Sequence, residues 1–359
     1  MNSNSKRSNE PPVTFLIGPA RSGTSLLYKT LSLHPRIGYI SNWVRRYPAF
    51  PEVAVFDRVA HRFPEARRAA WFGDGANAYV YGAARSRARR AFPMPVEGEP
   101  LYTRADIGIP TDSTDRGTAE QHEAIRRSFG RILRADGGDV LVTKRIANNL
   151  RIPLLAAAFP AARFVRLVRD GRAVAYSLSR VDWWETDPVW WYGGTPAQWA
   201  ADGGDPWEIC ARNWVEEMEA AERGLSAVPP EQVMTLRYEE FVREPIDHLH
   251  AIAEFMGVGV LEAWDDALRQ LRFPDRNEQW AESLTDEARL TIEKWQRPML
   301  DRFGVKMPGT MTSILDLSGS LYETRFSYLG ESGMSLFDQT ILPPGNLHPR
   351  LVSSYEDQF

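Results

Sequence analysis

The sequence predicts an α/β domain in which a central parallel sheet is flanked by helices. Short apolar runs that begin at Val13, Val140, Phe164 and Val233 are typical of buried strands, and segments with helical spacing separate them. Two of these runs pass through a tight turn directly into a helix. Such alternation favours a parallel sheet, because each helix carries the chain back to begin the next strand in the same direction.

Composition limits the possible functions before any motif is considered. The chain has 359 residues, of which 43% are hydrophobic, and this is ample for a core. A formal net charge of -4 argues against binding nucleic acid or anionic membranes in general, so any anion site must be local. The single cysteine, Cys210, excludes an internal disulfide, and we expect it to be a core residue in a reducing compartment.

Residues 1–12 are expected to form a disordered N-terminal leader. They are polar and lack the apolar region of a signal peptide. The strands that follow are too short to span a bilayer. We therefore predict a cytoplasmic protein with no transmembrane segment.

The loop after the first strand, Val13 to Ile17, has the features of an anion site. Gly18 and Gly23 allow consecutive backbone N–H groups to turn towards one ligand. The helix that follows directs its positive dipole end to the same place. Side-chain donors in and after the loop are Arg21, Ser22, Thr24 and Ser25. This combination predicts a site for an anion of phosphate or sulfate shape.

The two glycines match the phosphate-loop spacing G-x-x-x-x-G-K-[ST], but Thr24 stands where the lysine should be. That lysine contacts the terminal phosphates in nucleotide triphosphatases, so its absence argues against ATP or GTP hydrolysis. The stretch GPARSGTSLL instead resembles the 5'-phosphosulfate loop of the PAPS-dependent sulfotransferase family, particularly its bacterial and tyrosylprotein branch.

The resemblance implies a P-loop-like sulfotransferase fold and 3'-phosphoadenosine-5'-phosphosulfate (PAPS) as sulfuryl donor, with no metal required. It assigns binding of the 5'-phosphosulfate to Arg21, Ser22, Gly23, Thr24 and Ser25. In the tyrosylprotein branch a glutamate near the end of the next strand is the catalytic base. Ser41 and Asn42 occupy this region here, so the role must pass to another residue.

Residues 57–134 are predicted to form a helical and loop insert that covers the mouth of the site. Its first part is rich in arginine and alanine, and is either a solvated face or a rim that attracts an anionic or sugar acceptor. A long loop follows, in which PVEG resembles the P-T-E-A segment of bacterial sulfotransferases. We therefore select Glu97 as general base ahead of Glu52 and His122; the alternative is that Glu97 is a solvated loop residue.

A lysine and an arginine follow two later strands. Lys144 ends the strand that begins at Val140, and ligands bind beyond the carboxyl ends of parallel strands. In the family a lysine of a K-x-P-like stretch stabilises charge on the transferring group, although Arg145 and Ile146 replace the usual residues here. The run RDGRAVAYS matches R-D-x-R-x-x-x-x-S, which assigns Arg169 and Ser177 to the donor's 3'-phosphate.

Tryptophans are dense between residues 181 and 214, where they either stack on a sugar or aromatic acceptor or hold irregular loops in place. LRYEEFVREP resembles a family segment that places Tyr238 near the adenine, and FPDRNEQW is expected to close over the nucleotide. The predicted domain covers residues 13–304. Residues 305–359 are predicted to form an extension packed on it.

These patterns predict transfer of a sulfuryl group from PAPS to a hydroxyl of a small molecule, glycan or glycolipid. The predicted catalytic residues are Arg21, Lys144 and Glu97. One alternative is a P-loop-like nucleotide-dependent kinase, which would require magnesium. The other is a carbohydrate- or nucleotide-binding protein that keeps the fold without catalysis. Neither the acceptor nor the oligomeric state follows from the sequence.

Overall fold

The structure is a computed structural model that describes residues 10–72 and 92–304. The predicted extension 305–359, most of the predicted leader and the basic segment 73–91 lie outside the described residues. Residues 10–12 of the leader are described and contact the domain. The backbone N–H of Ala161 donates to the Glu10 carboxylate at 3.1 Å, and that of Leu141 donates to the Pro12 carbonyl at 2.9 Å.

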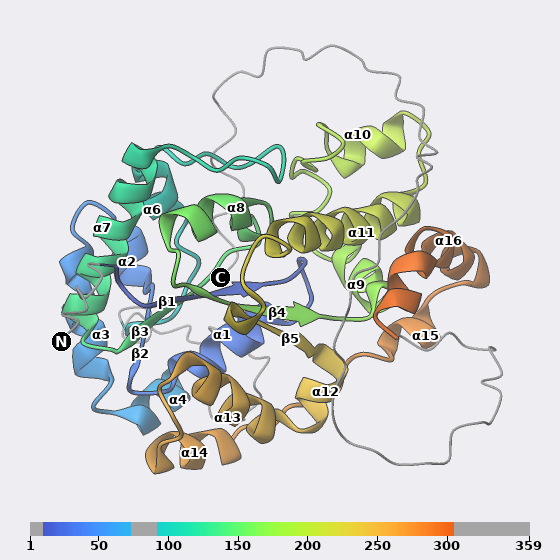
Figure 1. The fold of residues 1–359 in the computed structure, drawn as a ribbon. Helices are drawn as coiled ribbons and strands as arrows, with labels where there is room; N and C mark the ends of the chain where they lie inside the picture. Colours follow the sequence, from blue (N-terminus) through green and yellow to red (C-terminus); the bar gives the residue numbers. More distant parts are fainter. Residues whose placement is uncertain (1–9, 73–91, 305–359) are drawn as a thin grey trace.

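Five parallel strands form one sheet in the order β2-β3-β1-β4-β5 (Figure 1). The strands are β1 (Val13–Ile17), β2 (Ile37–Tyr39), β3 (Val140–Lys144), β4 (Arg163–Val168) and β5 (Val233–Arg237). The α/β prediction with a central parallel sheet is therefore confirmed. Because β1 pairs with both β3 and β4, it lies at the centre of the sheet.

Helices cover both faces of the sheet, and further helices pack beside its carboxyl edge. The α-helices are α1 (Thr24–Ser32), α2 (Asn42–Arg46), α3 (Val55–Ala60), α4 (Pro64–Phe72), α6 (Glu99–Arg104), α7 (Ala119–Asp136), α8 (Asn148–Ala158), α9 (Gly171–Leu178), α10 (Pro196–Ala201), α11 (Pro206–Leu225), α12 (Tyr238–Arg243), α13 (Pro245–Met256), α14 (Glu262–Arg269), α15 (Gln279–Ser283) and α16 (Asp286–Arg302). Two short 3-10 helices are η1 (Pro51–Ala54) and η2 (Pro230–Gln232).

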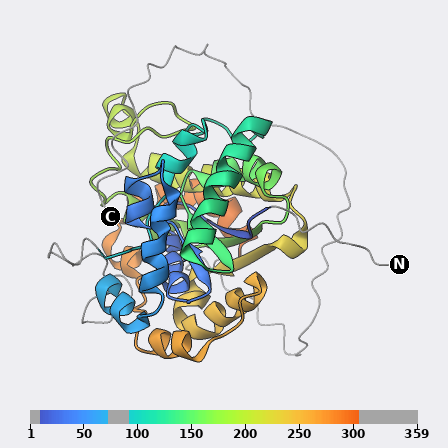
Figure 2. The ribbon, with the colours of Figure 1, turned by 90° about the vertical axis from the view of Figure 1, so that its left-hand side faces the viewer.

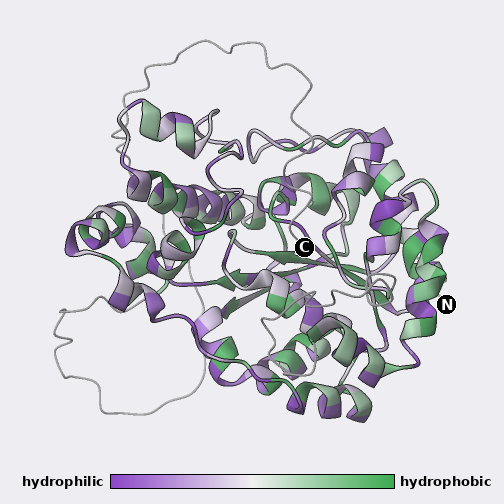
Figure 3. Cartoon of the chain, turned by 180° about the vertical axis from the view of Figure 1, so that it is seen from behind, coloured by the Kyte–Doolittle hydropathy of each residue, from purple (hydrophilic) through white to green (hydrophobic). Residues whose placement is uncertain are grey.

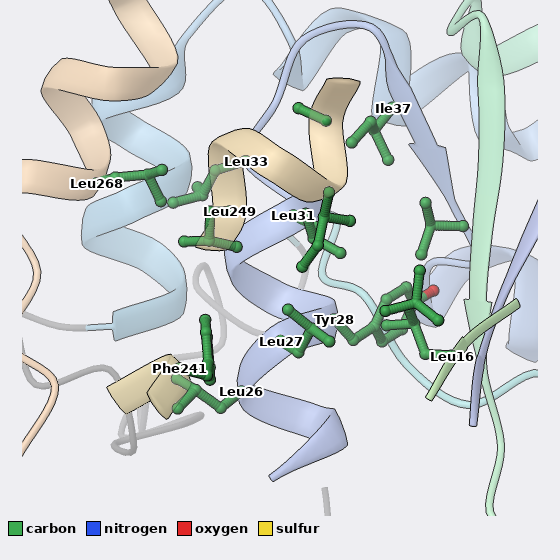
Figure 4. Close-up of a cluster of buried hydrophobic side chains, with 14 of the residues drawn as sticks. Leu16, Leu26, Leu27, Tyr28, Leu31, Leu33, Ile37, Phe241, Leu249 and Leu268 are labelled. Atoms are coloured by element: carbon green, nitrogen blue, oxygen red, sulfur yellow. The ribbon is translucent and has the colours of Figure 1, made fainter. Parts of the chain in front are cut away.

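Successive side chains of β1 point to opposite faces of the sheet, and this explains why helices form a layer on each face. Leu16 points into one core cluster with residues of α1, α4, α13 and α14, whereas Phe15 and Ile17 point into another with residues of α6, α7 and α8. Figure 4 shows part of the first cluster, to which α1 contributes Leu27 and Leu31 and α13 contributes Leu249. In Figure 3 the strands at the centre carry the hydrophobic colour, as expected for a sheet that is buried on both faces.

Two helices of the predicted insert, α4 and α7, flank the sheet and do not line the site cavity. Helix α7 begins at a capping box on Thr118 and packs against α8, β2 and η1, so it belongs to a layer that flanks the sheet. Helix α4 packs on the opposite face, in the cluster that contains α1. An amphipathic helix buries its apolar stripe most fully when the stripe packs against the sheet. The loop residue Glu97 is the described part of the insert that lines the site cavity.

Buried polar side chains join α1 to its neighbours. The His34 ring follows α1, accepts the N–H of Arg36 at Nδ1 (3.1 Å) and donates from Nε2 to the Gly259 carbonyl (3.1 Å). Burial lowers the pKa of His34 to about 4, so the ring is neutral at pH 7 and its contacts are those of a residue that ends a helix. The indole of Trp264 packs edge-on against this ring, with 4.8 Å between centroids, and donates to the Thr30 carbonyl at 3.1 Å.

We predict that Trp264→Ala lowers the free energy of unfolding by about 3–5 kcal/mol, the usual cost of removing a buried aromatic side chain. The indole is fully buried and its removal also leaves the Thr30 carbonyl without this donor. Chemical denaturation measures the change. Leu290→Ala is the control, because Leu290 is 69% exposed and its loss should change stability by less than about 0.5 kcal/mol. Equal stability of the two variants would contradict the packing described for α14.

Candidate functional site

The loop between β1 and α1 is held from beneath by side chains of two distant helices. Asn149 of α8 accepts the backbone N–H of Gly18 at 2.9 Å. Glu217 of α11 accepts the backbone N–H of Ala20 at 3.2 Å. These bonds fix the loop's shape before any ligand binds.

Tight packing at the start of α1 explains the second glycine of the loop. Gly23 has φ 96°, a left-handed conformation that side chains rarely adopt. A Cβ at this position would also lie 2.6 Å from the Tyr238 ring. Arg21 adopts a left-handed φ of 65° as well, which is uncommon for a residue with a side chain. Strain of this kind is found where a backbone is shaped for binding.

A cavity of about 470 Å³ opens above this loop, at the carboxyl edge of the sheet. The register aligns that edge, because Leu16 of β1 lies opposite Lys144 of β3 and Ile17 lies opposite Arg166 of β4. The cavity is lined by Arg21, Gly23, Thr24, Ser25, Leu26, Glu97, Lys144, Arg145, Ile146, Arg169, Ala173, Tyr176, Ser177, Arg180, Val181, Trp183, Tyr238, Arg276, Gln279 and Trp280. Six cationic side chains and one carboxylate make this lining suitable for an anion.

Every residue selected from the sequence lines this cavity except Ser22. Ser22 is fully buried, its hydroxyl donates to the Pro19 carbonyl at 2.7 Å, and its backbone N–H donates to the same oxygen at 3.1 Å. The side chain of Ser22 therefore shapes the loop from inside. Thr24 and Ser25 begin α1, and the dipole of that helix directs partial positive charge into the cavity.

Arg21, Arg169 and Ser177 lie together although they come from three separate segments. Nε of Arg21 donates to the Ser177 hydroxyl at 3.0 Å, and Nη1 of Arg169 donates to the Arg21 carbonyl at 2.8 Å. The Arg169 guanidinium also lies 4.3 Å from the centroid of the Tyr238 ring. Tyr238 is thus packed between Gly23 and Arg169, with 1% of its surface exposed.

Arg169 also contacts the segment that the sequence suggested as a closing loop. Its Nε donates to Asn277 at 3.2 Å and its Nη2 donates to the Arg276 carbonyl at 3.3 Å. These described contacts use three of the five N–H donors of a guanidinium, so a phosphate can still be bound through the others. The loop therefore meets the rest of the cavity at Arg169.

A chain of alternating charges runs from the cavity into the interior. Lys144 pairs closely with Glu97, and Arg145 donates to Glu97 at 2.6 Å. Arg145 also donates to Glu99 at 2.8 Å, and Arg151 closes the chain with two bonds to Glu99 at 2.6 and 3.0 Å. Each side chain in this series of ion pairs has at most 15% of its surface exposed. Buried charges persist only when they are paired in this way.

Glu97 reaches the cavity because its loop pairs with the end of the second strand. The backbone N–H of Asn42 donates to the Met94 carbonyl at 3.0 Å, and that of Val96 donates to the Ile40 carbonyl at 2.9 Å. Ser41 faces Pro95 across this bridge. The Glu97 carboxylate therefore lies beside Ser41 and Asn42, whose own side chains carry no carboxylate.

The two other candidates for the base lie away from the cavity lining. Glu52 is exposed and pairs with Arg131 at 2.5 Å, and His122 contacts the Arg116 carbonyl at 2.6 Å. Neither residue lines the cavity. Among the three candidates, the geometry favours Glu97.

Burial alone would raise the pKa of Glu97, but the positive charges of Lys144 and Arg145 outweigh it and lower the pKa to about 2. The carboxylate is therefore ionised at neutral pH. A base that is this well neutralised accepts a proton poorly while Lys144 remains on it. In this arrangement the Glu97 carboxylate is therefore ionised but only weakly basic.

Glu217 beneath the loop shows the opposite behaviour. Burial raises the pKa of Glu217 to about 7, although three hydrogen bonds to its carboxylate, from Asn213, the Ala20 N–H and Asn149, oppose the shift. Asn213 in turn accepts the indole N–H of Trp191 at 3.2 Å. A hydrogen-bonded network therefore links the tryptophan-rich segment to the anion loop.

The tryptophan-rich segment serves mainly to pack its own loops. Trp191 and Trp199 lie around the Arg212 guanidinium, at 4.5 and 5.6 Å from its carbon, and Trp184 and Trp214 are buried. Trp183 lines the cavity. Cys210, as predicted, is a core residue with 1% exposure.

The sequence analysis did not identify several residues that line the cavity or that support the loop between β1 and α1. Arg145, Arg180 and Arg276 add positive charge to the cavity, and Tyr176, Gln279 and Trp280 extend its wall. Arg180 follows Ser177 by three residues, so its position near the same wall of α9 could have been inferred from helical spacing. Asn149 and Glu217 carried no such signal, because their contacts to the loop span 131 and 197 residues.

Residues 10–72 and 92–304 contain no group of three or more His, Cys, Asp or Glu placed to hold a metal ion. Over the same residues, no helix is long and apolar enough to cross a membrane.

Comparisons with known proteins agree with this geometry. A family model described as "Sulfotransferase family" matches residues 12–266. Two curated relatives, each named omega-hydroxy-beta-dihydromenaquinone-9 sulfotransferase Stf3, come from Mycobacterium bovis and Mycobacterium tuberculosis. Each is 26% identical over 166 residues, which is 46% of this chain and 41% of the relative. The matched stretch thus spans less than half the length of these relatives.

A similar fold occurs in the crystal structure of sulfotransferase STF9 from Mycobacterium avium. That structure has a TM-score of 0.53 and 18% sequence identity, with 84% of this chain and 78% of that chain covered. At this level of identity the likeness extends to the fold: a parallel sheet with helices on both faces.

We predict that Glu217 makes stability depend on pH. The pKa of Glu217 is raised from its ordinary value of 4.5 to about 7, so its contribution is fully present below pH 4.5 and is lost as pH rises through 7. Relative to Glu217→Gln, which cannot ionise, the wild type should lose about 3 kcal/mol between pH 5 and pH 8. Chemical denaturation at both pH values measures the difference.

Glu219→Gln is the control, because Glu219 lies on the same helix with its side chain 47% exposed. Its difference from the wild type should be nearly the same at both pH values. A Glu217→Gln difference that is equally flat would mean that Glu217 does not titrate in this range.

Proposed function

The chain belongs to the sulfotransferase family, and from this premise we propose that it transfers a sulfuryl group from PAPS to a hydroxyl of a small molecule. The products are adenosine 3',5'-bisphosphate and a sulfate ester. One observation carries the proposal: Lys144 stands at the carboxyl edge beside the anion loop and pairs with Glu97, the one carboxylate of the described residues that lines the cavity. A cation and a base in contact are what the reaction requires.

The residues present fit the donor at both of its anionic ends. We assign the 5'-phosphosulfate to Arg21, Gly23, Thr24 and Ser25, whose loop and helix start supply positive charge and N–H groups. Ser22 supports this loop from within. Arg169 and Ser177 are assigned to the 3'-phosphate, and the guanidinium fork of Arg169 suits phosphate oxygens.

Tyr238 and the 276–280 segment are assigned to the nucleoside side of the donor. Tyr238 supports Arg169 through its ring, while Arg276 and Trp280 line the same cavity. Tyr238 thereby acts on the donor chiefly through Arg169.

In the proposed reaction, the bond between sulfur and the donor's phosphate oxygen breaks while a bond from sulfur to the acceptor oxygen forms. Lys144 and Arg21 stabilise the charge on the transferring and leaving oxygens. The acceptor hydroxyl loses its proton to Glu97. Catalysis is thus assigned to Arg21, Lys144 and Glu97.

The pairing of Lys144 with Glu97 links donor binding to proton removal. The sulfonate of the donor competes with Glu97 for the ammonium group of Lys144. When Lys144 turns to the donor, the pKa of Glu97 rises from about 2, because one of its two neutralising charges has moved. Arg145 remains and keeps the carboxylate in place through Glu99 and Arg151. The base is therefore activated only when a donor is present.

We assign the acceptor to the part of the cavity lining formed by Tyr176, Val181 and Trp183. These side chains give that wall an aromatic and apolar surface, which suits a flat ring or a sugar face. The two curated relatives are named for a menaquinone derivative with a terminal hydroxyl. We propose a small-molecule hydroxyl, and glycan or glycolipid acceptors fit the same wall.

Two alternative functions make different predictions. A kinase would bind ATP with magnesium, but Thr24 stands at the lysine position of the phosphate loop. A protein without catalysis would bind the bisphosphate and never turn over, but the contact between Lys144 and Glu97 supports a working site.

Incubation with labelled PAPS and a panel of phenolic, lipid and sugar hydroxyls tests the proposal. Label should appear in an acceptor without added magnesium. Titration should show that adenosine 3',5'-bisphosphate binds more tightly than ATP. Tight binding of ATP with no binding of the bisphosphate would overturn the proposal.

Arg169→Ala should weaken bisphosphate binding by about 1.5–3 kcal/mol, the range for hydrogen bonds to a charged group. Isothermal titration measures the change. Arg163→Ala is the matched control, because Arg163 begins the same strand at the opposite edge and contacts the Met256 carbonyl. Unchanged affinity in Arg169→Ala would show that the 3'-phosphate lies elsewhere.

Glu97→Gln should reduce turnover by about 100-fold or more, because the amide keeps the shape of the side chain but cannot accept the proton. Bisphosphate affinity should stay within a few-fold of wild type. Glu52→Gln serves as the control, since Glu52 lies outside the cavity lining. Near-normal turnover in Glu97→Gln would exclude this carboxylate as the base.

A further inference from the structure

Large apolar side chains are exposed on one short segment of the described chain. Six of the nine exposed large apolar residues lie between positions 47 and 63. We call this set the aromatic surface; it consists of Tyr47, Phe50, Val55, Phe56, Val59 and Phe63, which are 41–65% exposed. Single exposed apolar residues are ordinary, but a cluster of this size marks an interaction site.

Four of the six residues of the aromatic surface, Tyr47, Val55, Phe56 and Val59, are joined into one face, and Phe50 and Phe63 lie at nearby positions in the chain. Val55, Phe56 and Val59 share a side of α3 by their helical spacing, while Asp57 and Ala60 on the other side are buried. The Trp43 ring of α2 links that helix to α3. It stacks on the Tyr47 ring with 6.2 Å between centroids, and its centroid lies 5.7 Å from that of the Phe56 ring on α3. Figures 1 and 2 place α2 and α3 on the outside of the molecule.

Positive charges surround this surface. Arg46, Arg58 and Arg62 are exposed within the same segment. No carboxylate of the described residues forms an ion pair with these three arginines, and the Arg46 guanidinium lies 5.8 Å from the centroid of the Tyr47 ring. The nearby acidic residues are occupied or hidden, because Glu52 pairs with Arg131 and Asp57 is fully buried.

We propose that the aromatic surface and its three arginines bind an anionic lipid bilayer. A short amphipathic segment with aromatic residues on its outer face can lie in the headgroup region, with arginines at the level of the lipid phosphates. The overall net charge of -4 does not oppose this, since the attraction is local and falls off within about a Debye length. The inference goes beyond the proposed function and does not depend on it.

A second copy of the chain fits this surface less well. A two-fold dimer would bring the three arginines close to their own copies, and like charges of this kind repel. A bilayer that contains anionic lipid presents one sign of charge over a wide area. The observed combination of exposed rings and unpaired arginines therefore favours the bilayer.

Vesicle flotation tests the proposal with the full chain. The probes are vesicles of phosphatidylcholine alone and vesicles with one quarter phosphatidylglycerol. The wild type should float with the anionic vesicles and much less with the neutral ones. Because the donor cavity also attracts anions, the assay includes saturating adenosine 3',5'-bisphosphate and the Arg169→Ala variant, neither of which should reduce flotation.

Two sets of substitutions separate the apolar and charged parts. Phe50→Ser with Phe56→Ser and Phe63→Ser should weaken anionic-vesicle binding by at least about tenfold. Arg46→Gln with Arg58→Gln and Arg62→Gln should weaken it by about fivefold per arginine at low salt. The control is Leu290→Ser, since Leu290 is the most exposed apolar side chain elsewhere, at 69%, and its loss should leave binding unchanged.

The phenylalanine, arginine and Leu290 variants alter exposed side chains, so their thermal unfolding should match the wild type. Absence of flotation by the wild type would overturn the proposal. So would equal binding by the wild type and the phenylalanine variant. Light scattering that shows a dimer, abolished by the same substitutions without any vesicle binding, would assign the surface to self-association instead.

Discussion

The parallel register of β1, β3 and β4 is the constraint on which the site depends. Parallel strands end at one edge, so the loop after β1, Lys144 and Arg169 meet there although they are far apart in the sequence. The loop and the two cations therefore line one cavity. Helices on both faces bury the sheet and hold this edge rigid.

Ion pairing determines the charge and the basicity of the buried groups. Lys144 and Glu97 neutralise one another in the resting site, and Arg145, Glu99 and Arg151 extend the alternation inward. Removing Glu97 or Glu99 would take away the carboxylate that pairs with the buried Lys144 or Arg151, and breaking a buried pair in this way costs several kcal/mol. A ligand anion that takes Lys144 therefore changes the basicity of Glu97 without moving the backbone.

Local sequence was sufficient for the parts of the site that lie within one strand, turn and helix unit. Arg169 and Ser177 are eight residues apart in the sequence, and the turn between them brings both to the cavity. The loop around Gly23 was predictable for the same reason. Glu97 was selected through a family resemblance, whereas its position depends on pairing with Ile40 and Asn42 some fifty residues earlier. Asn149 and Glu217 could not be identified, because long-range contacts leave no local pattern. The sequence did not predict that α4 and α7 of the insert pack on the sheet, because an apolar stripe does not reveal which surface it will be buried against.

The anion loop is already ordered by Asn149 and Glu217, and this has a kinetic consequence. A preformed site spends little conformational entropy on binding, so more of the interaction energy appears as affinity. Under the proposed function, that gain extends to the product adenosine 3',5'-bisphosphate, which keeps both phosphates of the donor. We expect release of this product to depend on how readily Arg169 gives up its bonds to Asn277 and to the Arg276 carbonyl.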